Sequence, residues 1–197
     1  MTESTNQFVI PKGTIDLIGI FVGVVRERFS DVAPGFPWKW DVDRNLTKIF
    51  IDAGGVDTYE SNDARPGIFI DRSSLVYNKL LLNDMADYNM KTGARDYLCR
   101  SAGQVAIDCV SKNRGESSQL GDMCGMHLLM SDDIFRAFYN VQDIGPISVQ
   151  NTQPWEKDDR VFVTRVTCEF SYDMSWRMKP SADRLDRIRA LIIPSVN

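Results

Sequence analysis

Residues 160–172, RVFVTRVTCEFSY, decide the fold class because their side chains alternate between two sets. Phe162, Thr164, Val166, Cys168 and Phe170 fall on one side of an extended chain, and the residues between them fall on the other. This alternation predicts a β-strand that runs from Arg160 to Tyr172. At roughly 3.3 Å per residue such a strand is about 40 Å long.

The same pattern appears upstream in residues 104–111, QVAIDCVS, where Val105, Ile107 and Cys109 share a side. A polar turn at 112–115 follows. We expect a helix from Ser117 or Ser118 to about Met130, and a shorter helix that opens at Asp132 and ends at Tyr139. Acidic residues suit that opening because a helix N-terminus carries partial positive charge.

Further elements are expected on both sides of this region. A helix is predicted from Thr14 to Phe29 and an amphipathic helix over 182–192. Short strands are predicted at 48–53 and 68–70, an extended stretch or helical turn at 75–82, a long hairpin loop or insertion near 84–103, and an edge strand at 144–150, which Pro146 interrupts.

The element order predicts an α+β fold with a mostly antiparallel sheet, helices packed on one face, and additional N-terminal and C-terminal helices. We expect one domain over residues 1–197. Its predicted parts are an N-terminal arm (1–13), a core (14–178) with a variable extended region near 84–103, and a basic amphipathic C-terminal helix and tail (179–197). Gly19 and Gly23 predict that the first helix packs closely on its neighbours through its glycines.

Composition excludes several function classes. The chain has 197 residues, a net charge of −4 and a single histidine, His127. A zinc site with two or three histidines is therefore impossible, and the acidic balance argues against nucleic-acid binding over the whole surface. The four cysteines show no CxxC spacing, and the first residues lack a signal-peptide pattern. These features predict a reducing cytosolic compartment during assembly, with no membrane partner.

Three groups of residues are candidates for a catalytic or binding site. Cys124 and His127 are neighbours on a predicted helix, as a catalytic pair would be, but a helix interior favours core packing instead. Adjacent acids at 132–133 and 158–159 diverge, so a helix start and a solvated turn are expected there. Trp38 and Trp40 suit either base stacking or a loop clamp. We therefore predict no catalytic residue, no cofactor-binding residue and no metal ligand.

Charge is distributed unevenly along the chain. Residues 115–159 hold eight acidic and two basic residues, net −6, and residues 176–192 hold five basic and two acidic ones, net +3. An acidic region and a basic tail on one molecule suit head-to-tail association of copies.

Four stretches carry a resemblance to a known family: RPGIFIDRS (65–73), GQVAIDCVSKNRGESSQLGDMCGMHLL (103–129), IGPISVQNTQPW (144–155) and RVFVTRVTCEFSYDMSWRM (160–178). Over residues 66–178 the chain resembles bacteriophage tail terminator (tail completion) proteins of the neck. The resemblance is one of periodicity and turns rather than of a chemical motif.

The resemblance implies a non-enzymatic virion component. Such proteins form a ring, commonly a hexamer, on the tail tube and join it to the head-side connector or stopper protein. Implied partners are further copies of the chain, tail tube and sheath proteins, the connector, and DNA in transit through the lumen. An acidic lumen would repel DNA, and residues 115–159 are a candidate for its lining. Alternatives are another neck or head-completion subunit, a small cytosolic enzyme using Cys124 and His127, and a nucleic-acid-binding module using Trp38, Trp40 and the Arg-rich tail.

Overall fold

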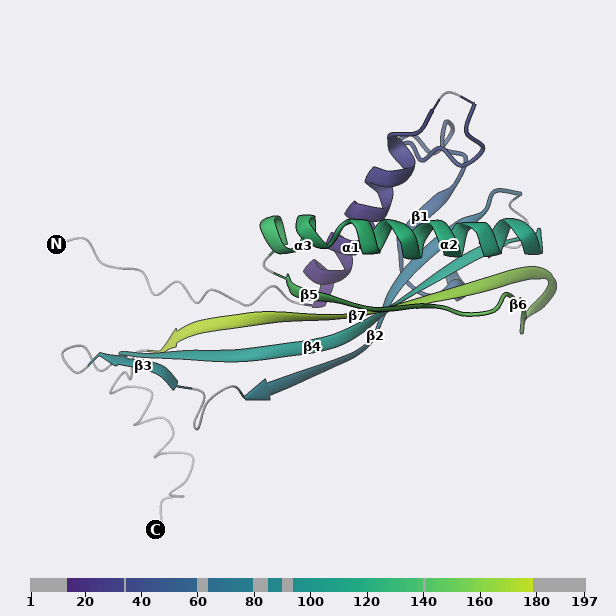
Figure 1. The fold of residues 1–197 in the computed structure, drawn as a ribbon. Helices are drawn as coiled ribbons and strands as arrows, with labels where there is room; N and C mark the ends of the chain where they lie inside the picture. The colour runs from purple at the N-terminus through teal and green to yellow at the C-terminus, as the bar shows by residue number, and fades with distance from the viewer. Residues whose placement is uncertain are drawn as a thin grey trace, which may run out of the picture. The chain divides into compact units, whose positions relative to one another are not determined.

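The structure is a computed structural model, and it describes residues 14–33, 35–59, 64–79, 85–89, 94–139 and 141–178. These residues form one seven-stranded mixed sheet and three α-helices, the predicted α+β class (Figure 1). The elements in chain order are α1 (Thr14–Ser30), β1 (Phe50–Ala53), the 3-10 helix η1 (Val56–Thr58), β2 (Gly67–Lys79), β3 (Met85–Asn89), β4 (Ala94–Ser111), α2 (Arg114–Met130), α3 (Asp132–Tyr139), β5 (Val141–Val149), β6 (Gln153–Trp155) and β7 (Asp158–Met178).

The sheet is mostly antiparallel, as predicted. Its strand order is β1-β2-β4-β7-β5, with β3 paired to β4 and β6 paired to β7. Both of these added pairs and the β5–β7 pair are antiparallel. The short β1 is the exception, because it lies parallel to β2 from Phe50 opposite Gly67 to Ala53 opposite Ile70.

The chain divides into two compact units, and each is built from segments that are distant in sequence. The larger unit comprises residues 12–76 and 101–172, and the smaller comprises residues 1–11, 77–100 and 173–197. Strands β2, β4 and β7 contribute residues to both units.

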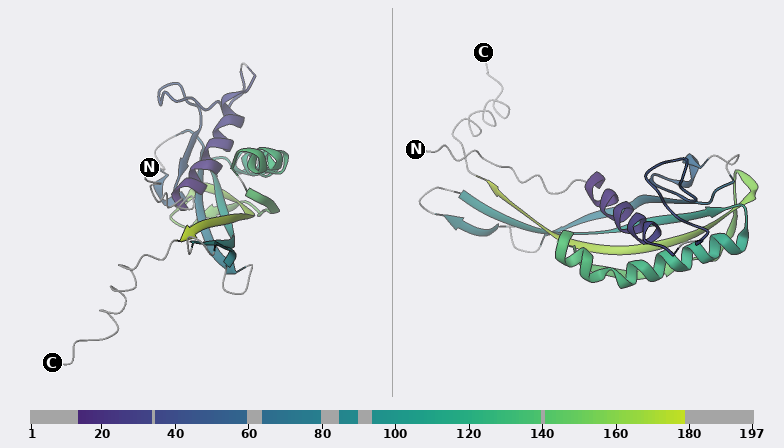
Figure 2. Two further views of the ribbon diagram at one scale, coloured as in Figure 1. Left: turned by 90° about the vertical axis from the view of Figure 1, so that its left-hand side faces the viewer. Right: turned by 90° about the horizontal axis from the view of Figure 1, so that it is seen from above.

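In the larger unit the three helices cover one face of the sheet (Figures 1 and 2). The alternation in β7 sets this face: Thr164, Val166, Cys168 and Phe170 are buried, whereas Arg165 and Glu169 on the other side are exposed. This is the alternation that the sequence predicts for residues 160–172.

Aromatic rings join three elements at the centre of this core. The Phe21 ring of α1 lies 4.8 Å from the Phe135 ring of α3 and 5.9 Å from the Phe170 ring of β7, measured between centroids. Phe21 and Phe135 are fully buried. Rings at this spacing add to the stability that burial provides.

Helix α2 begins at Arg114, three residues before the earliest predicted start at Ser117. The Asn113 side chain accepts hydrogen bonds from the backbone N–H groups of Gly115 (2.9 Å) and Glu116 (3.4 Å). Asparagine caps a helix because its side-chain oxygen satisfies N–H groups that the first turn leaves unpaired. The polar turn predicted at 112–115 therefore contains the cap and the first turn of the helix.

The prediction that α1 packs through Gly19 and Gly23 is wrong. Both are exposed, and a Cβ atom built on either would have no neighbour within 4 Å. The close-packed glycines belong to α2 instead. A Cβ on Gly121 would lie 2.5 Å from Thr164 Cγ2, and one on Gly125 would lie 3.0 Å from Val149 Cγ2. These two glycines let α2 approach β5 and β7 closely.

A second, smaller cluster lies on the opposite face of the larger unit's sheet. Tyr59, Phe69, Val110 and Val161 are buried there, with Trp155 partly buried against them. Tyr59 also donates a hydrogen bond from its hydroxyl to the carbonyl of Arg65 (3.0 Å). The loop after η1 and the β6 turn thus cover one part of this face.

In the smaller unit, the hairpin of β3 and β4 pairs Met85 with Tyr97 and Asn89 with Ala94. Residues 94–103, predicted as part of a loop or insertion, belong to β4. The Arg100 guanidinium donates two hydrogen bonds to the Asp173 carboxylate, at 2.8 and 3.1 Å. The predicted helix over 182–192 lies outside the described residues.

Candidate functional site

Cys124 and His127 share helix α2 but have different partners. Cys124 Sγ lies 3.8 Å from Cys109 Sγ in the buried core, and His127 Nε2 lies 3.0 Å from the Val24 carbonyl oxygen of α1. A nucleophile–base pair requires the two groups to lie within hydrogen-bonding reach of each other. Each side chain is instead directed to its own structural contact, as expected for core packing.

The thiol environments oppose ionisation. A hydrogen bond with Cys124 and burial raise the pKa of the Cys109 thiol, and burial raises the pKa of Cys168 to about 12. Thiolate is the reactive form of cysteine, and a raised pKa depletes it at neutral pH. These two cysteines therefore have the properties of core residues.

His127 links α2 to α1. Because a carbonyl oxygen only accepts, the Nε2 atom of His127 carries the proton in this hydrogen bond. Burial of the half-buried ring lowers the pKa of His127 from its usual value of 6.5, although the bond to Val24 opposes that shift. The imidazole is therefore neutral at pH 7 and acts as a tether between the helices.

The acidic pair 132–133 lies at the helix start predicted for it. Asp132 is in the first turn of α3 and pairs with Arg136 one turn later, at 2.9 Å. The prediction of a solvated turn at 158–159 is wrong, because both residues belong to the start of β7. Asp158 is only 14% exposed and accepts from the Arg160 side chain at 2.9 Å and from its backbone N–H at 3.0 Å. Among the described residues, no three His, Cys, Asp or Glu side chains converge as a metal site would require.

Trp38 and Trp40 hold the loop after α1 against the core. Trp38 is 7% exposed, and its Nε1–H donates to the Glu116 carboxylate at 2.7 Å. Glu116 also accepts from the Ser111 hydroxyl. The Trp40 ring lies under the Arg26 guanidinium, 4.9 Å from its centroid, while Arg26 donates to the carbonyl of Ile51. These contacts match a loop clamp, which the sequence offers as the alternative to base stacking by Trp38 and Trp40.

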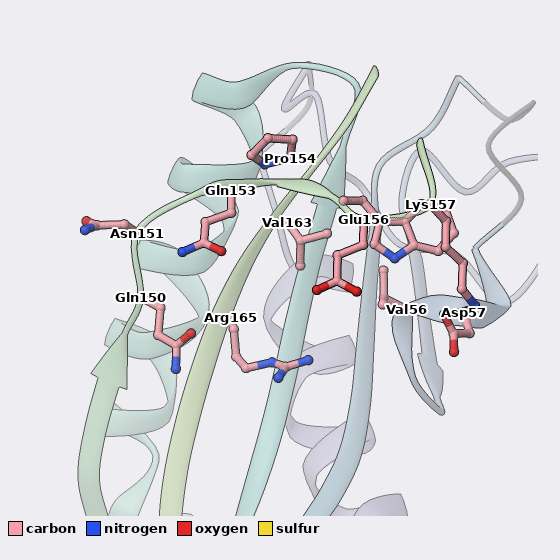
Figure 3. Close-up of a pocket in the computed structure, with 11 residues that line it drawn as sticks. Val56, Asp57, Gln150, Asn151, Gln153, Pro154, Glu156, Lys157, Val163 and Arg165 are labelled. Atoms are coloured by element: carbon pink, nitrogen blue, oxygen red, sulfur yellow. Dashed lines mark hydrogen bonds and ion pairs between the residues drawn. The ribbon is translucent and has the colours of Figure 1, made fainter. Parts of the chain in front are cut away.

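A pocket of about 370 Å³ opens on the sheet face opposite the helices (Figure 3). Residues from η1, the β5–β6 turn, β6 and β7 line it. Both cations at this pocket are already paired: Arg165 with Asp108 at 2.7 Å, and Lys157 with Asp57 at 2.7 Å. The Asp108–Arg165 pair joins β4 to β7 and was not predicted from the sequence. The pocket thus presents side-chain amides, Trp155 and the Glu156 carboxylate, while its two cations are paired within the fold.

The two outer edges of the larger unit's sheet differ in their capacity to form hydrogen bonds with a further strand. Edge strand β5 has two register shifts against β7 and contains Pro146, which lacks an N–H. At the other edge β1 ends opposite Ile70, so residues 71–76 of β2 have no strand on that side within the described part of the chain. Val76 in this stretch is 55% exposed. Open strand edges are templates for pairing with another chain.

Several acids of the strongly acidic segment 115–159 have partners within the fold. Glu116 accepts a hydrogen bond from Trp38, Asp132 and Asp143 contact Arg136, and Asp158 binds Arg160. Asp122 and Asp133 are exposed on the helices. Because Trp38 is neutral and Arg136 belongs to the segment, these contacts leave most of its net charge of −6 in place.

No helix in the described ranges has the length and hydropathy needed to cross a membrane. A scan against protein-family models finds no match for the chain, and a search of curated proteins finds no similar sequence.

Proposed function

We propose that the protein is a structural subunit of the neck of a tailed bacteriophage, namely the tail terminator, which assembles as a ring on the tail tube and joins it to the head-side connector. The proposal has two supports. The first is the resemblance over residues 66–178. The second is the strand edge at residues 71–76.

The strand edge is the observation that carries the proposal. A neighbouring copy or a tail protein that adds a strand at this edge would satisfy main-chain groups of residues 73–76 that no described strand pairs on that side. The backbone N–H of Arg72 already donates to the Asp71 carboxylate at 2.7 Å. The β2 edge and the bulged β5 edge are unlike each other, so edge pairing favours one side of the subunit. Head-to-tail contacts of this kind form a ring when the rotation between neighbouring copies closes.

The contacts of Cys124 and His127 favour this proposal over the enzyme reading. Their side chains bind Cys109 and Val24 rather than each other. An enzyme that used them would lose its activity on alkylation of Cys124 or on His127→Ala, whereas ring formation would persist wherever the fold does.

The contacts of the tryptophans bear on the nucleic-acid reading. Trp38 is buried, so stacking a base on its ring would require the loop to move, and the Arg26 guanidinium covers one face of the Trp40 ring. A binding module would show micromolar, strongly salt-dependent affinity for oligonucleotides. We expect no such affinity at low salt.

Size-exclusion chromatography with light scattering, together with electron microscopy of the protein mixed with purified tail tubes, tests the proposal. We expect closed rings, either free or seated at the end of the tubes. Val76→Lys should weaken assembly because lysine on a strand edge disfavours pairing. Val42→Lys is the matched control, because Val42 is 84% exposed in a loop away from the edge.

A monomeric protein that also leaves tail tubes unbound would contradict the proposal. Rings located on the head side of the neck in intact virions would instead support the head-completion alternative. Equal assembly by Val76→Lys and Val42→Lys would remove the β2 edge from the interface.

A further inference from the structure

The outer side of α2 carries an exposed apolar ridge. Met126, Leu129 and Met130 are 56%, 64% and 75% exposed, and we call these three residues the α2 ridge. At about 100° per residue they fall within an arc of roughly 100°. The opposite side of the same helix is buried through Gly121, Gly125 and Leu128. Methionine-rich surfaces of this kind are common at binding sites because the side chains adapt to their partner.

Acidic residues flank the α2 ridge. Exposed Asp122 lies one helical turn before Met126, on the same side of α2, and exposed Asp133 lies in the first turn of α3. The nearby cation, Arg136, is engaged by Asp132 at 2.9 Å and by Asp143 at 3.5 Å. The ridge is thus an apolar strip in a negatively charged setting. Helix α1 lies beside α2 on the sheet (Figure 2), and it leaves the ridge uncovered.

The chain contains a segment with the complementary pattern. In residues 179–197 the apolar residues Leu185, Ile188 and Ile192 recur at the spacing of one helical stripe, and arginines at 184, 187 and 189 accompany them. The stretch 176–192 carries a net charge of +3. An apolar stripe with basic flanks matches an apolar ridge with acidic flanks, both in hydrophobicity and in the sign of the charge.

We propose that the α2 ridge binds the C-terminal segment, residues 179–197, of a second copy of this chain. The choice of a second copy rests on the proposed ring, because a ring requires two different complementary patches on each subunit. The ridge is one patch and the C-terminal segment is the other. Apolar contact supplies the affinity, and the charges select the register and the partner.

Disulfide trapping between two full-length chains tests the inference. One chain carries Met130→Cys and the other, with a tag of different size, carries Leu185→Cys. The native cysteines are buried, so mild oxidation should report on the introduced pair. We expect a mixed disulfide of one chain with the other, in a yield that falls at high salt because charges guide the contact. A chain with Leu46→Cys is the matched control: Leu46 is 60% exposed in a loop and should not crosslink to Leu185→Cys.

Charge reversal provides a second, independent readout. Asp122→Arg in the ridge chain should lower the crosslink yield, and Arg187→Glu in the partner chain should restore it. Equal crosslinking of Met130→Cys and Leu46→Cys would overturn the inference. So would a chain carrying both Met130→Cys and Leu185→Cys that forms only an internal disulfide at every concentration, since the occupant would then be the chain's own tail.

The outcomes separate this inference from the proposed function. Rings that form on tail tubes without the Met130–Leu185 crosslink would reject the interface and leave the neck assignment standing. A specific crosslink in a protein that neither forms rings nor binds tail tubes would support the interface and reject the neck assignment.

Discussion

Gly121 of α2 faces Thr164 of β7 so closely that a Cβ atom on Gly121 would lie 2.5 Å from Thr164 Cγ2. The Thr164 hydroxyl is also held, because it lies 2.9 Å from the Ser117 hydroxyl and 2.7 Å from that of Thr152. Thr164 cannot rotate away from a larger neighbour without breaking these bonds. The spacing between α2 and the sheet therefore depends on glycine at position 121.

Gly121→Ala should destabilise the fold by about 1–3 kcal/mol, the usual cost of overpacking a close-packed core. Gly19→Ala is the matched control. It should be neutral or stabilising by up to about 1 kcal/mol, because Gly19 is an exposed helix residue with no neighbour within 4 Å of its Cβ position. Urea denaturation followed by circular dichroism measures both changes. A Gly121→Ala variant as stable as Gly19→Ala would contradict the close contact.

Stability should fall as the pH drops below about 6.5, in part because of His127. Its pKa is lower in the folded protein than in the unfolded chain, chiefly through burial. The unfolded chain therefore takes up the proton first, so the contribution of neutral His127 is complete above the unfolded pKa and is lost as the pH falls through the folded one. Nearby Arg28 strengthens this effect and Glu27 weakens it.

Free energies of unfolding from pH 5 to pH 8, compared between the wild type and His127→Gln, measure this contribution. Glutamine does not titrate and retains an N–H donor for Val24. We expect a shallower pH dependence for the variant between pH 5 and 7. Parallel curves for the two proteins would show that His127 does not contribute.

Cys109 and Cys168 should resist alkylation in the native protein. Burial contributes to the raised pKa of both thiols, to about 12 for Cys168, so little thiolate forms at pH 8. Intact-mass measurements with iodoacetamide should show slow labelling of these two residues in buffer and rapid labelling in denaturant. Rapid labelling of either residue without denaturant would contradict the buried environment.

Arg165→Ala should destabilise the protein by about 1–3 kcal/mol, because it leaves a buried carboxylate without its partner. The Asp108 side chain is 7% exposed and accepts two hydrogen bonds from Arg165, at 2.7 and 2.9 Å. Lys157→Ala is the control: Lys157 also pairs with an aspartate, Asp57, but the two side chains are 62% and 67% exposed. Exposed pairs contribute little, so we expect a change below about 0.5 kcal/mol. Equal effects of the two substitutions, measured by urea denaturation, would contradict this assignment.

Local periodicity was sufficient to predict several elements. The alternation over 160–172 predicted the central part of β7 and which of its residues share a face, and the pattern over 104–111 predicted the inner part of β4. Helix α3 was predicted with its exact bounds, and Thr14–Phe29 differs from α1 by one residue. These features are predictable because each depends on which neighbouring residues share a face of one element.

The candidate surfaces were less predictable. The spacing of Trp38 and Trp40 is compatible with a loop clamp. However, Glu116, which accepts the hydrogen bond from Trp38, is 78 residues away in sequence. The α2 ridge lies within a helix that the sequence predicts, yet exposure of Met126, Leu129 and Met130 depends on which side of α2 faces the sheet. Apolar residues occur all around α2, so its local pattern does not distinguish those that are buried from those that remain on the surface.

The sequence by itself determined the α+β class and the main strands and helices. With a single histidine, it also excluded metal sites that need two or more histidines. Only the tertiary structure decided that Gly121 and Gly125, rather than Gly19 and Gly23, are the close-packed glycines, that β1 lies parallel to β2, and that Asp108 meets Arg165. The physical reason is range: propensity and periodicity act between residues a few positions apart. Packing, ion pairing and open strand edges depend instead on contacts between segments that only the folded chain brings together.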